Sequence, residues 1–122
     1  MLQLTSIYST KKEELKRNKF SLREIVENVV KSSKFINASH PNKYIVNIDD
    51  QIPEYLIGDE VKISQILINL IGNASKFTFD GEITINLTRV KNQNNKLCVH
   101  FNIKDTGVGI SEEKLEMIFD EF

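Results

Sequence analysis

The ten residues from Lys96 to Asp105 alternate between apolar and polar side chains. A period of two predicts a β-strand that has one face in a core and the other face in water. The inward series is Leu97, Val99, Phe101 and Ile103. Asp105 continues this series, and a carboxylate removed from water needs a strong hydrogen-bond donor. We therefore expect Asp105 to end the strand and to accept a hydrogen bond from a buried amine.

Two segments carry the pattern of amphipathic helices. The first follows Phe20, because Ser21 and Glu24 form a capping box and Phe20 with Ile25 a hydrophobic staple. Its predicted inward face is Leu22, Ile25, Val26, Val29, Ser33 and Ile36. The second runs from about Glu60 to Phe77, and Asp59 can cap it. Its predicted inward face is Ile63, Ile66, Leu67, Leu70, Ala74 and Phe77.

The remaining segments are shorter. Within residues 40–49, Pro41 and Asn42 predict a break, and the alternation of Tyr44, Val46 and Ile48 predicts a strand after it. Residues 81–90 predict another strand, and residues 51–58 predict a loop. Residues 111–119 predict another helix, since Ser111 can cap it and two glutamates occupy its first turn. Residues 1–19 predict the end of a helix followed by a solvated, charged connector, so we place the domain at residues 20–122.

A polar stripe runs along the second helix. Asn69, Asn73 and Lys76 fall within about 60° at 100° per residue. Asn73 borders the apolar face, so we expect its amide to be partly shielded from water. Burying an amide without a partner costs roughly 1–3 kcal/mol. Either the stripe is solvated and a neighbouring backbone group satisfies Asn73, or the stripe is a ligand site whose amide oxygens suit Mg²⁺ and whose lysine suits phosphate.

The segment "DTGVGI" after the long strand is open to two interpretations. Gly107 and Gly109 permit positive φ and let a ligand approach the backbone, while Ile110 restores an apolar surface. Alternatively, the segment is only a tight turn between a strand and a helix, with an acidic cap.

Charge and composition exclude several classes of protein. Sixteen Lys and Arg against seventeen Asp and Glu give a net charge of -1, and no basic run favours nucleic acid. The single cysteine, Cys98, excludes an internal disulfide and favours a reducing compartment. No apolar run approaches the roughly 18 residues that span a bilayer. We expect a cytoplasmic domain, whose full-length protein could be anchored in a membrane.

Three motifs resemble those of the histidine protein kinases. The segment "NLIGNASKFT" resembles their N box, "DTGVGI" their G1 box, and "FDEF" their F box. The motifs stand in the family's order. The segment "FSLREIVENVV" also resembles the first helix of the family's catalytic domain, and residues 1–19 resemble the tail of the preceding dimerisation helix.

The resemblance implies an α+β fold, the two-layer α/β sandwich shared with the gyrase, mismatch-repair and chaperone ATPases. In that fold three helices lie on one face of a mixed sheet, and ATP sits between the helices and a lid. The chain stops at Phe122, before the family's second glycine-rich box and its last helix and strand. The resemblance thus implies a fold that is incomplete at the C-terminus.

The resemblance also implies roles for individual residues. Asn73 would coordinate Mg²⁺, Asn69 would assist at the metal and the phosphates, and Lys76 would contact phosphate oxygens, so Asn69 and Lys76 would carry the catalysis. Phe77 would flank the purine of ATP and Asp105 would accept a hydrogen bond from its amino group. The base pocket would be lined by Gly107, Gly109 and Ile110.

The implied reaction is phosphoryl transfer to a protein histidine in two-component signalling. The ATP-hydrolysing relatives have a glutamate base where this helix has Asn69, and an amide cannot take a proton from water. The acceptor histidine would lie on a separate dimerisation domain, because neither His40, followed by Pro41, nor His100 on a strand matches the family's H box. A response-regulator receiver domain and a homodimer are the other implied partners.

Two classes of function follow from these expectations. The chain is either the ATP-binding part of a sensor or hybrid histidine kinase, inactive by itself, or a non-catalytic nucleotide-binding or regulatory module built on the same fold. The asparagines, Lys76 and Asp105 favour the kinase, whereas the missing lid and acceptor favour the module. An ATPase of the gyrase type is disfavoured by Asn69.

Overall fold

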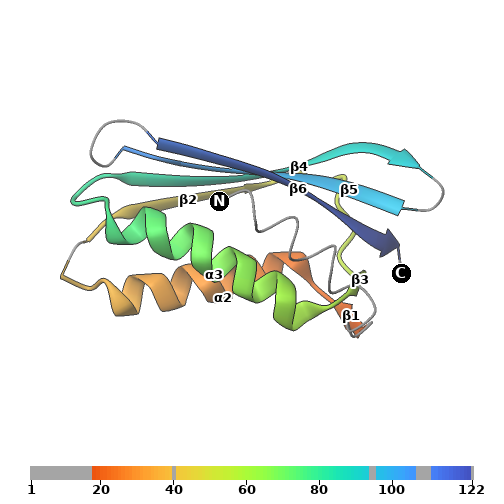
Figure 1. Ribbon diagram of the computed structural model, residues 1–122, viewed down its shortest axis with the longest axis horizontal. Helices are drawn as coiled ribbons and strands as arrows, with labels where there is room; N and C mark the ends of the chain where they lie inside the picture. The colour runs from red at the N-terminus through yellow and green to blue at the C-terminus, as the bar shows by residue number, and fades with distance from the viewer. Residues whose placement is uncertain (1–17, 40, 94–95, 107–110, 122) are drawn as a thin grey trace.

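The computed structural model describes residues 18–39, 41–93, 96–106 and 111–121. Within these residues, two helices cover one face of a six-stranded mixed sheet (Figure 1). The helices are α2 (Leu22–Ile36) and α3 (Glu60–Lys76). The strands, in their order across the sheet, are β1 (Asn18–Phe20), β3 (Leu56–Gly58), β6 (Ser111–Glu121), β5 (Lys96–Asp105), β4 (Glu82–Gln93) and β2 (Lys43–Ile48). The predicted α+β sandwich is therefore confirmed.

The centre of the sheet is an antiparallel unit of β4, β5 and β6. β2 joins β4 in parallel, because the segment between them, which contains β3 and α3, returns the chain to the end of the sheet where β2 begins. The register of β4 and β5 sets Ile83 opposite Asp105 and Leu87 opposite Phe101. Both members of each pair are buried, so one face of these strands belongs to the core.

Both predicted helix caps are present. The Ser21 hydroxyl accepts a hydrogen bond from the Glu24 amide at 3.3 Å, and the Asp59 carboxylate accepts one from the Lys62 amide at 3.1 Å. Each cap satisfies one of the amides that the first turn of a helix leaves without a partner. The helices therefore begin where the sequence predicts.

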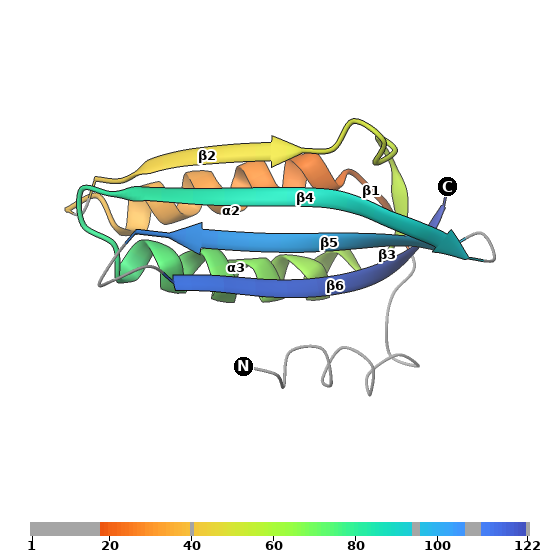
Figure 2. The ribbon, with the colours of Figure 1, turned by 90° about the horizontal axis from the view of Figure 1, so that it is seen from above.

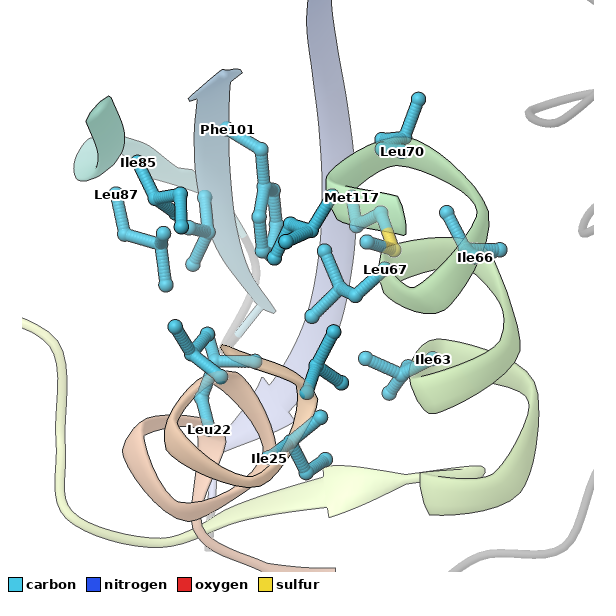
Figure 3. Packing of buried hydrophobic residues seen from close by; sticks show 14 of the residues in the cluster. Leu22, Ile25, Ile63, Ile66, Leu67, Leu70, Ile85, Leu87, Phe101 and Met117 are labelled. Carbon is cyan, nitrogen blue, oxygen red and sulfur yellow. The ribbon is translucent and has the colours of Figure 1, made fainter. Parts of the chain in front are cut away.

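The core lies between the sheet and the two helices (Figure 3). Leu22 and Ile25 of α2, Leu67 of α3, and Leu87 and Phe101 of the sheet belong to one buried cluster. All five side chains are buried, and burying each one contributes roughly 1.5–3 kcal/mol. The outward positions of β5 are polar or half-buried, as the alternation predicts.

The helix predicted for residues 111–119 is wrong, because this segment forms β6. Its sequence also alternates, so that Met117 and Phe119 are buried and Leu115 is half-buried, while Glu112, Lys114, Glu116 and Ile118 are exposed. β5 offers a partner along its whole length, from Lys96 opposite Asp120 to Asp105 opposite Ser111. The period-two pattern prevails over the helical one because this edge of β5 pairs a whole strand.

Three smaller expectations also need correction. The predicted loop at residues 51–58 contains β3, and β1 begins at Asn18, inside the predicted connector. Ile36 was predicted to face inward but is 75% exposed, because α2 ends there and the amide of Asn37 bonds to the Ser33 carbonyl. The described residues contain two of the three helices implied by the resemblance. Within the described part of the chain, neither helix combines the length and apolarity needed to cross a membrane.

Candidate functional site

Among the described candidate residues, Asn73, Lys76 and Asp105 lie at the same end of the molecule. β5 runs toward the end of the sheet where α3 finishes, so Asp105 and the last turns of α3 share that end (Figure 2). The stripe residues Asn73 and Lys76 lie in those last turns. The predicted residues Gly107, Gly109 and Ile110 lie outside the described residues.

The polar stripe of α3 faces solvent. Asn69, Asn73 and Lys76 are all exposed, so the prediction that the Asn73 amide is partly shielded is wrong. The buried side chains of α3 belong to the core between the helices and the sheet, and Asn73 is not among them. An exposed asparagine costs only about 0.5 kcal/mol of helix propensity relative to alanine. The amides are therefore available to a ligand that approaches from solvent.

Phe77 also departs from its predicted position. It is 55% exposed rather than inward, because α3 ends at Lys76 and Phe77 is the capping residue, with φ of -104°. The Lys76 ammonium lies 5.3 Å from the centroid of the Phe77 ring. This end of α3 thus presents an aromatic ring and a cation side by side, a pair that suits a ligand with a planar base and phosphates.

Asp105 is buried, with 8% of its surface exposed, as the alternation of β5 predicts. The strand end is fixed beyond it, because the amide of Thr106 donates to the Glu82 carbonyl at 3.2 Å and the Thr106 hydroxyl accepts from the Glu82 amide at 3.0 Å. These two bonds extend the pairing of β4 and β5 by one residue. The carboxylate of Asp105 is consequently held on a rigid element.

Thr78 is a residue that the sequence reasoning missed. It is fully buried, and its hydroxyl oxygen has no hydrogen-bond partner among the described residues. It follows Phe77 in the turn between α3 and β4. No sequence pattern marks its hydroxyl, because the helical pattern ends at Phe77 and a threonine in a turn is ordinary.

A group of polar side chains, here called the polar bracket, fixes this turn to the neighbouring elements. It consists of Asn37, Asn42, Tyr44 and Ser75. The side chain of Asn42 donates to the Thr78 carbonyl at 2.8 Å and to the Ser75 carbonyl at 3.4 Å, and it accepts from the Gly81 amide at 3.0 Å. The buried hydroxyl of Ser75 bonds to the side chains of Asn37, at 3.1 Å, and Tyr44. The sequence identifies Asn42 only as a break. In the structure, the side chain of Asn42 holds the turn between α3 and β4 in place.

The donor set fits a magnesium ion that arrives together with phosphate groups. Mg²⁺ prefers hard oxygen ligands and usually keeps several waters or phosphate oxygens in its shell. The described residues hold no cluster of three or more His, Cys, Asp or Glu side chains that could bind a metal. The exposed amide oxygens of Asn69 and Asn73 could complete such a shell but could not build one alone.

A cavity of about 550 Å³ lies away from these residues. It is lined by Arg23 of α2, by the end of β2 with Asp49, and by Asn86, Leu87 and Thr88 of β4. None of these is a predicted site residue. We place the site at the end of α3 because the chemically suited groups gather there.

Comparison with known proteins agrees with the motifs. The sequence model of the histidine kinase-, DNA gyrase B- and HSP90-like ATPases matches residues 58–122, more than half of the chain. The signal transduction histidine-protein kinase BarA of Escherichia coli K12 is 35% identical over 105 residues, which cover 84% of this chain and 11% of BarA. The aerobic respiration control sensor protein ArcB homolog of Haemophilus influenzae is 34% identical and covers 89% of this chain, which spans 32% of that protein.

Solved structures agree on the fold. The mycobacterial sensor histidine kinase MprB superposes with a TM-score of 0.63 at 18% identity, over 79% of this chain and 59% of that one. Full-length ShkA in complex with AMPPNP gives a TM-score of 0.63 at 22% identity, over 78% of this chain and 19% of ShkA. The chain therefore belongs to the family of histidine kinase-, DNA gyrase B- and HSP90-like ATPases, and its motifs and relatives place it with the histidine kinases.

Proposed function

We propose that the chain binds Mg-ATP as the catalytic part of a sensor or hybrid histidine kinase and presents the γ-phosphoryl group to a histidine on another domain. One observation carries the proposal: the exposed Asn73 amide and Lys76 ammonium in the last turns of α3 share one end of the molecule with the buried carboxylate of Asp105. The two ends of a nucleotide, its phosphates and its base, match these two sets of groups. Its phosphates suit Lys76, and its base suits an acceptor sheltered from water.

The residues of the chain bind and orient in this proposal. Lys76 holds phosphate oxygens, Phe77 lies against the purine, and Asp105 accepts a hydrogen bond from the amino group of adenine. Asn69 and Asn73 would hold Mg²⁺, which supplies neutralisation of phosphate charge when it is bound. Gly107, Gly109 and Ile110 are proposed to line the base, by resemblance to the G1 box.

Transfer to another protein group fits the residues better than hydrolysis does. Asn69 stands where the hydrolysing relatives have a glutamate, and its amide cannot serve as a general base. Phosphoryl transfer relies on positioning and charge neutralisation, which amides, a lysine and a metal can provide. His100 is a poor acceptor, since it lies on the outer face of β5 with its Nδ1 3.5 Å from a Glu116 carboxylate oxygen.

The partners of the proposed kinase follow from the family. A dimerisation domain would carry the acceptor histidine, a receiver domain would take the phosphoryl group onward, and the full-length protein would form a homodimer in the cytoplasm. The chain spans only 11% of the length of BarA, so the activity of a whole sensor is proposed for the longer protein and not for this chain. We keep the boundary between the preceding helix and the domain near Phe20.

Calorimetric titration tests the binding step. Mg-ATP and Mg-GTP are titrated in parallel into the chain and into a version extended by the residues that follow in the full-length gene. The proposal expects saturable binding of Mg-ATP by the extended protein and much weaker binding of Mg-GTP, because a carboxylate accepts from the adenine amino group but repels the carbonyl oxygen of guanine. If neither protein binds Mg-ATP, the non-catalytic module becomes the better description.

A further inference from the structure

β2 lies at the margin of the sheet, and no strand among the described residues pairs with its outer side (Figure 2). In a parallel pair, the N–H and C=O of one residue point to the same side, and the next residue points to the other. The amides of Lys43 and Asp49 donate hydrogen bonds of 2.9 Å to carbonyls on the β4 side. The residues that turn their N–H and C=O to the open edge are therefore Tyr44, Val46 and Ile48.

This edge lacks the features that usually prevent edge strands from pairing, namely proline, charge, a bulge or very short length. The pairing of β2 with β4 runs without a shift from Lys43 to Ile48, and the five residues after Lys43 contain no proline or charge. The side chains of Tyr44, Val46 and Ile48 are only partly buried at the border of the core. Backbone groups and apolar surface are thus both available along β2.

α2 runs beside this edge in the direction opposite to β2. Arg23, in the first turn of α2, lines a cavity together with residues 46–49 at the end of β2. The ammonium of Lys34, in the last turn, lies 5.5 Å from the centroid of the Tyr44 ring near the beginning of β2. The middle of α2 therefore lies level with Val46.

The charges of α2 gather on the flank next to β2. All five charged residues of the helix are exposed and fall within about 100° at 100° per residue. They form the charged flank, which consists of Arg23, Glu24, Glu27, Lys31 and Lys34. Its first half contains both glutamates and its second half both lysines. When two such flanks lie side by side in opposite directions, the glutamates of each face the lysines of the other.

We infer that the open edge of β2 and the charged flank form an interface for a second copy of this chain. The two β2 strands pair antiparallel about a twofold axis at Val46, which sets Tyr44 of each copy opposite Ile48 of the other and forms about six backbone hydrogen bonds. The α2 helices then lie antiparallel, with Glu27 near Lys31 of the other copy, twice in the dimer. The inference goes beyond the proposed function and does not depend on it.

A second copy fits this surface better than a strand from a uniformly charged partner. An acidic strand would suit the two lysines and be repelled by the two glutamates, and a basic strand would meet the converse problem. Only a partner whose charge changes sign along its length suits both halves. The chain itself carries that pattern.

Sedimentation equilibrium tests the charges without any nucleotide. Glu27→Lys and Lys31→Glu each turn two attractive pairs into repulsive ones, so each variant should dimerise about three- to thirtyfold more weakly than the wild type. An equal mixture of the two variants should regain the affinity of the wild type, because every pair across the mixed dimer is again attractive. Lys114→Glu makes the same change at an exposed position of β6 and should stay within about twofold of the wild type.

Amide hydrogen exchange of the wild type, measured by NMR over a range of concentrations, locates the interface. The amides of Tyr44, Val46 and Ile48 should exchange more slowly as the concentration rises, whereas those of Ile45 and Asn47, which face β4, should be protected throughout. A chain that stays monomeric up to about 1 mM contradicts the inference. So does a dimer that leaves the three edge amides unprotected, or one in which the mixture of variants is no tighter than either variant alone.

Discussion

Gly81 lies so close to Thr106 that a β-carbon on the glycine would stand 2.6 Å from the threonine hydroxyl. That hydroxyl accepts a hydrogen bond from the Glu82 amide at 3.0 Å, so it cannot move aside without breaking one of the two bonds between Thr106 and Glu82 that extend the pairing of β4 and β5. The contact joins the turn after α3 to the strand end after Asp105. The two halves of the candidate site are therefore held together by a close approach that only glycine permits here.

Gly81→Ala should lower the free energy of unfolding by about 1–3 kcal/mol, because overpacking forces Thr106 or Thr78 to shift. Gly72→Ala is the matched control, since a β-carbon there meets nothing within 4 Å. Gly72 lies inside α3, where alanine should raise stability by about 0.5–1 kcal/mol. Urea unfolding of both variants gives the two values, and equal effects of the same sign would contradict the close approach.

Asn42→Ala should destabilise the protein by about 1–3 kcal/mol, because it leaves partly buried backbone groups of the turn without their partners. It should also weaken nucleotide binding, since Lys76 and Phe77 lie between the two carbonyls that Asn42 holds. Asn47→Ala, which removes an exposed bond to Asn86, serves as the control and should cost less than about 1 kcal/mol. If the Asn42 variant were as stable as the Asn47 variant, the polar bracket would not stabilise the fold as described.

The stability of the protein should depend on the carboxylate of Asp49 at acid pH. Hydrogen bonds from the backbone amides of Gln51 and Arg89 lower the pKa of Asp49 below its ordinary value of 3.8. A pKa lowered by folding means that the ionised group stabilises the folded state above the unfolded pKa, and that this stability is lost as the pH falls through the folded pKa. The difference in unfolding free energy between wild type and Asp49→Asn should thus be full near pH 6 and shrink below about pH 4. A difference that stays constant with pH would contradict this role.

Asn73→Ala should abolish the dependence of nucleotide affinity on Mg²⁺ if Asn73 is a ligand of the metal. Because Asn73 is exposed on a helix, the variant should be slightly more stable, by about 0.5 kcal/mol. Gln65→Ala changes another exposed amide of the same helix, two turns earlier, and controls for loss of a carboxamide as such. The measurement is ADP affinity with Mg²⁺ and with a chelator. A normal response of Asn73→Ala to the metal would exclude the ligand role.

Local signals predicted the beginnings of the helices better than their ends. Ser21 and Asp59 act through bonds within a few residues, and those bonds are visible in the sequence. Ile36 and Phe77 continue the apolar pattern, but each stands where its helix stops and is exposed. Where a helix stops depends here on Asn37, Asn42 and Ser75, whose partners are up to 39 residues away in the chain. No local pattern carries that information.

The segment 111–121 shows the limit of periodicity. Its residues satisfy a helical reading through the Ser111 cap and a strand reading through Leu115, Met117 and Phe119. The choice depends on whether a partner strand is available, and β5 provides one over ten residue pairs. The burial of Asp105 was predictable because it follows from the same strict alternation in β5. The exposure of Asn73 was not predictable from the sequence, because it depends on which flank of α3 the other elements cover.

The central claim is that Asp105 accepts a hydrogen bond from a purine bound against the end of α3. The most direct measurement is the calorimetric titration of ADP into wild type and Asp105→Asn, with Asp50→Asn as a control at an exposed aspartate. We expect Asp105→Asn to keep the circular dichroism spectrum of the wild type and to lose detectable ADP binding. Asp50→Asn should bind ADP as the wild type does. Equal affinity of the wild type and a folded Asp105→Asn would contradict it.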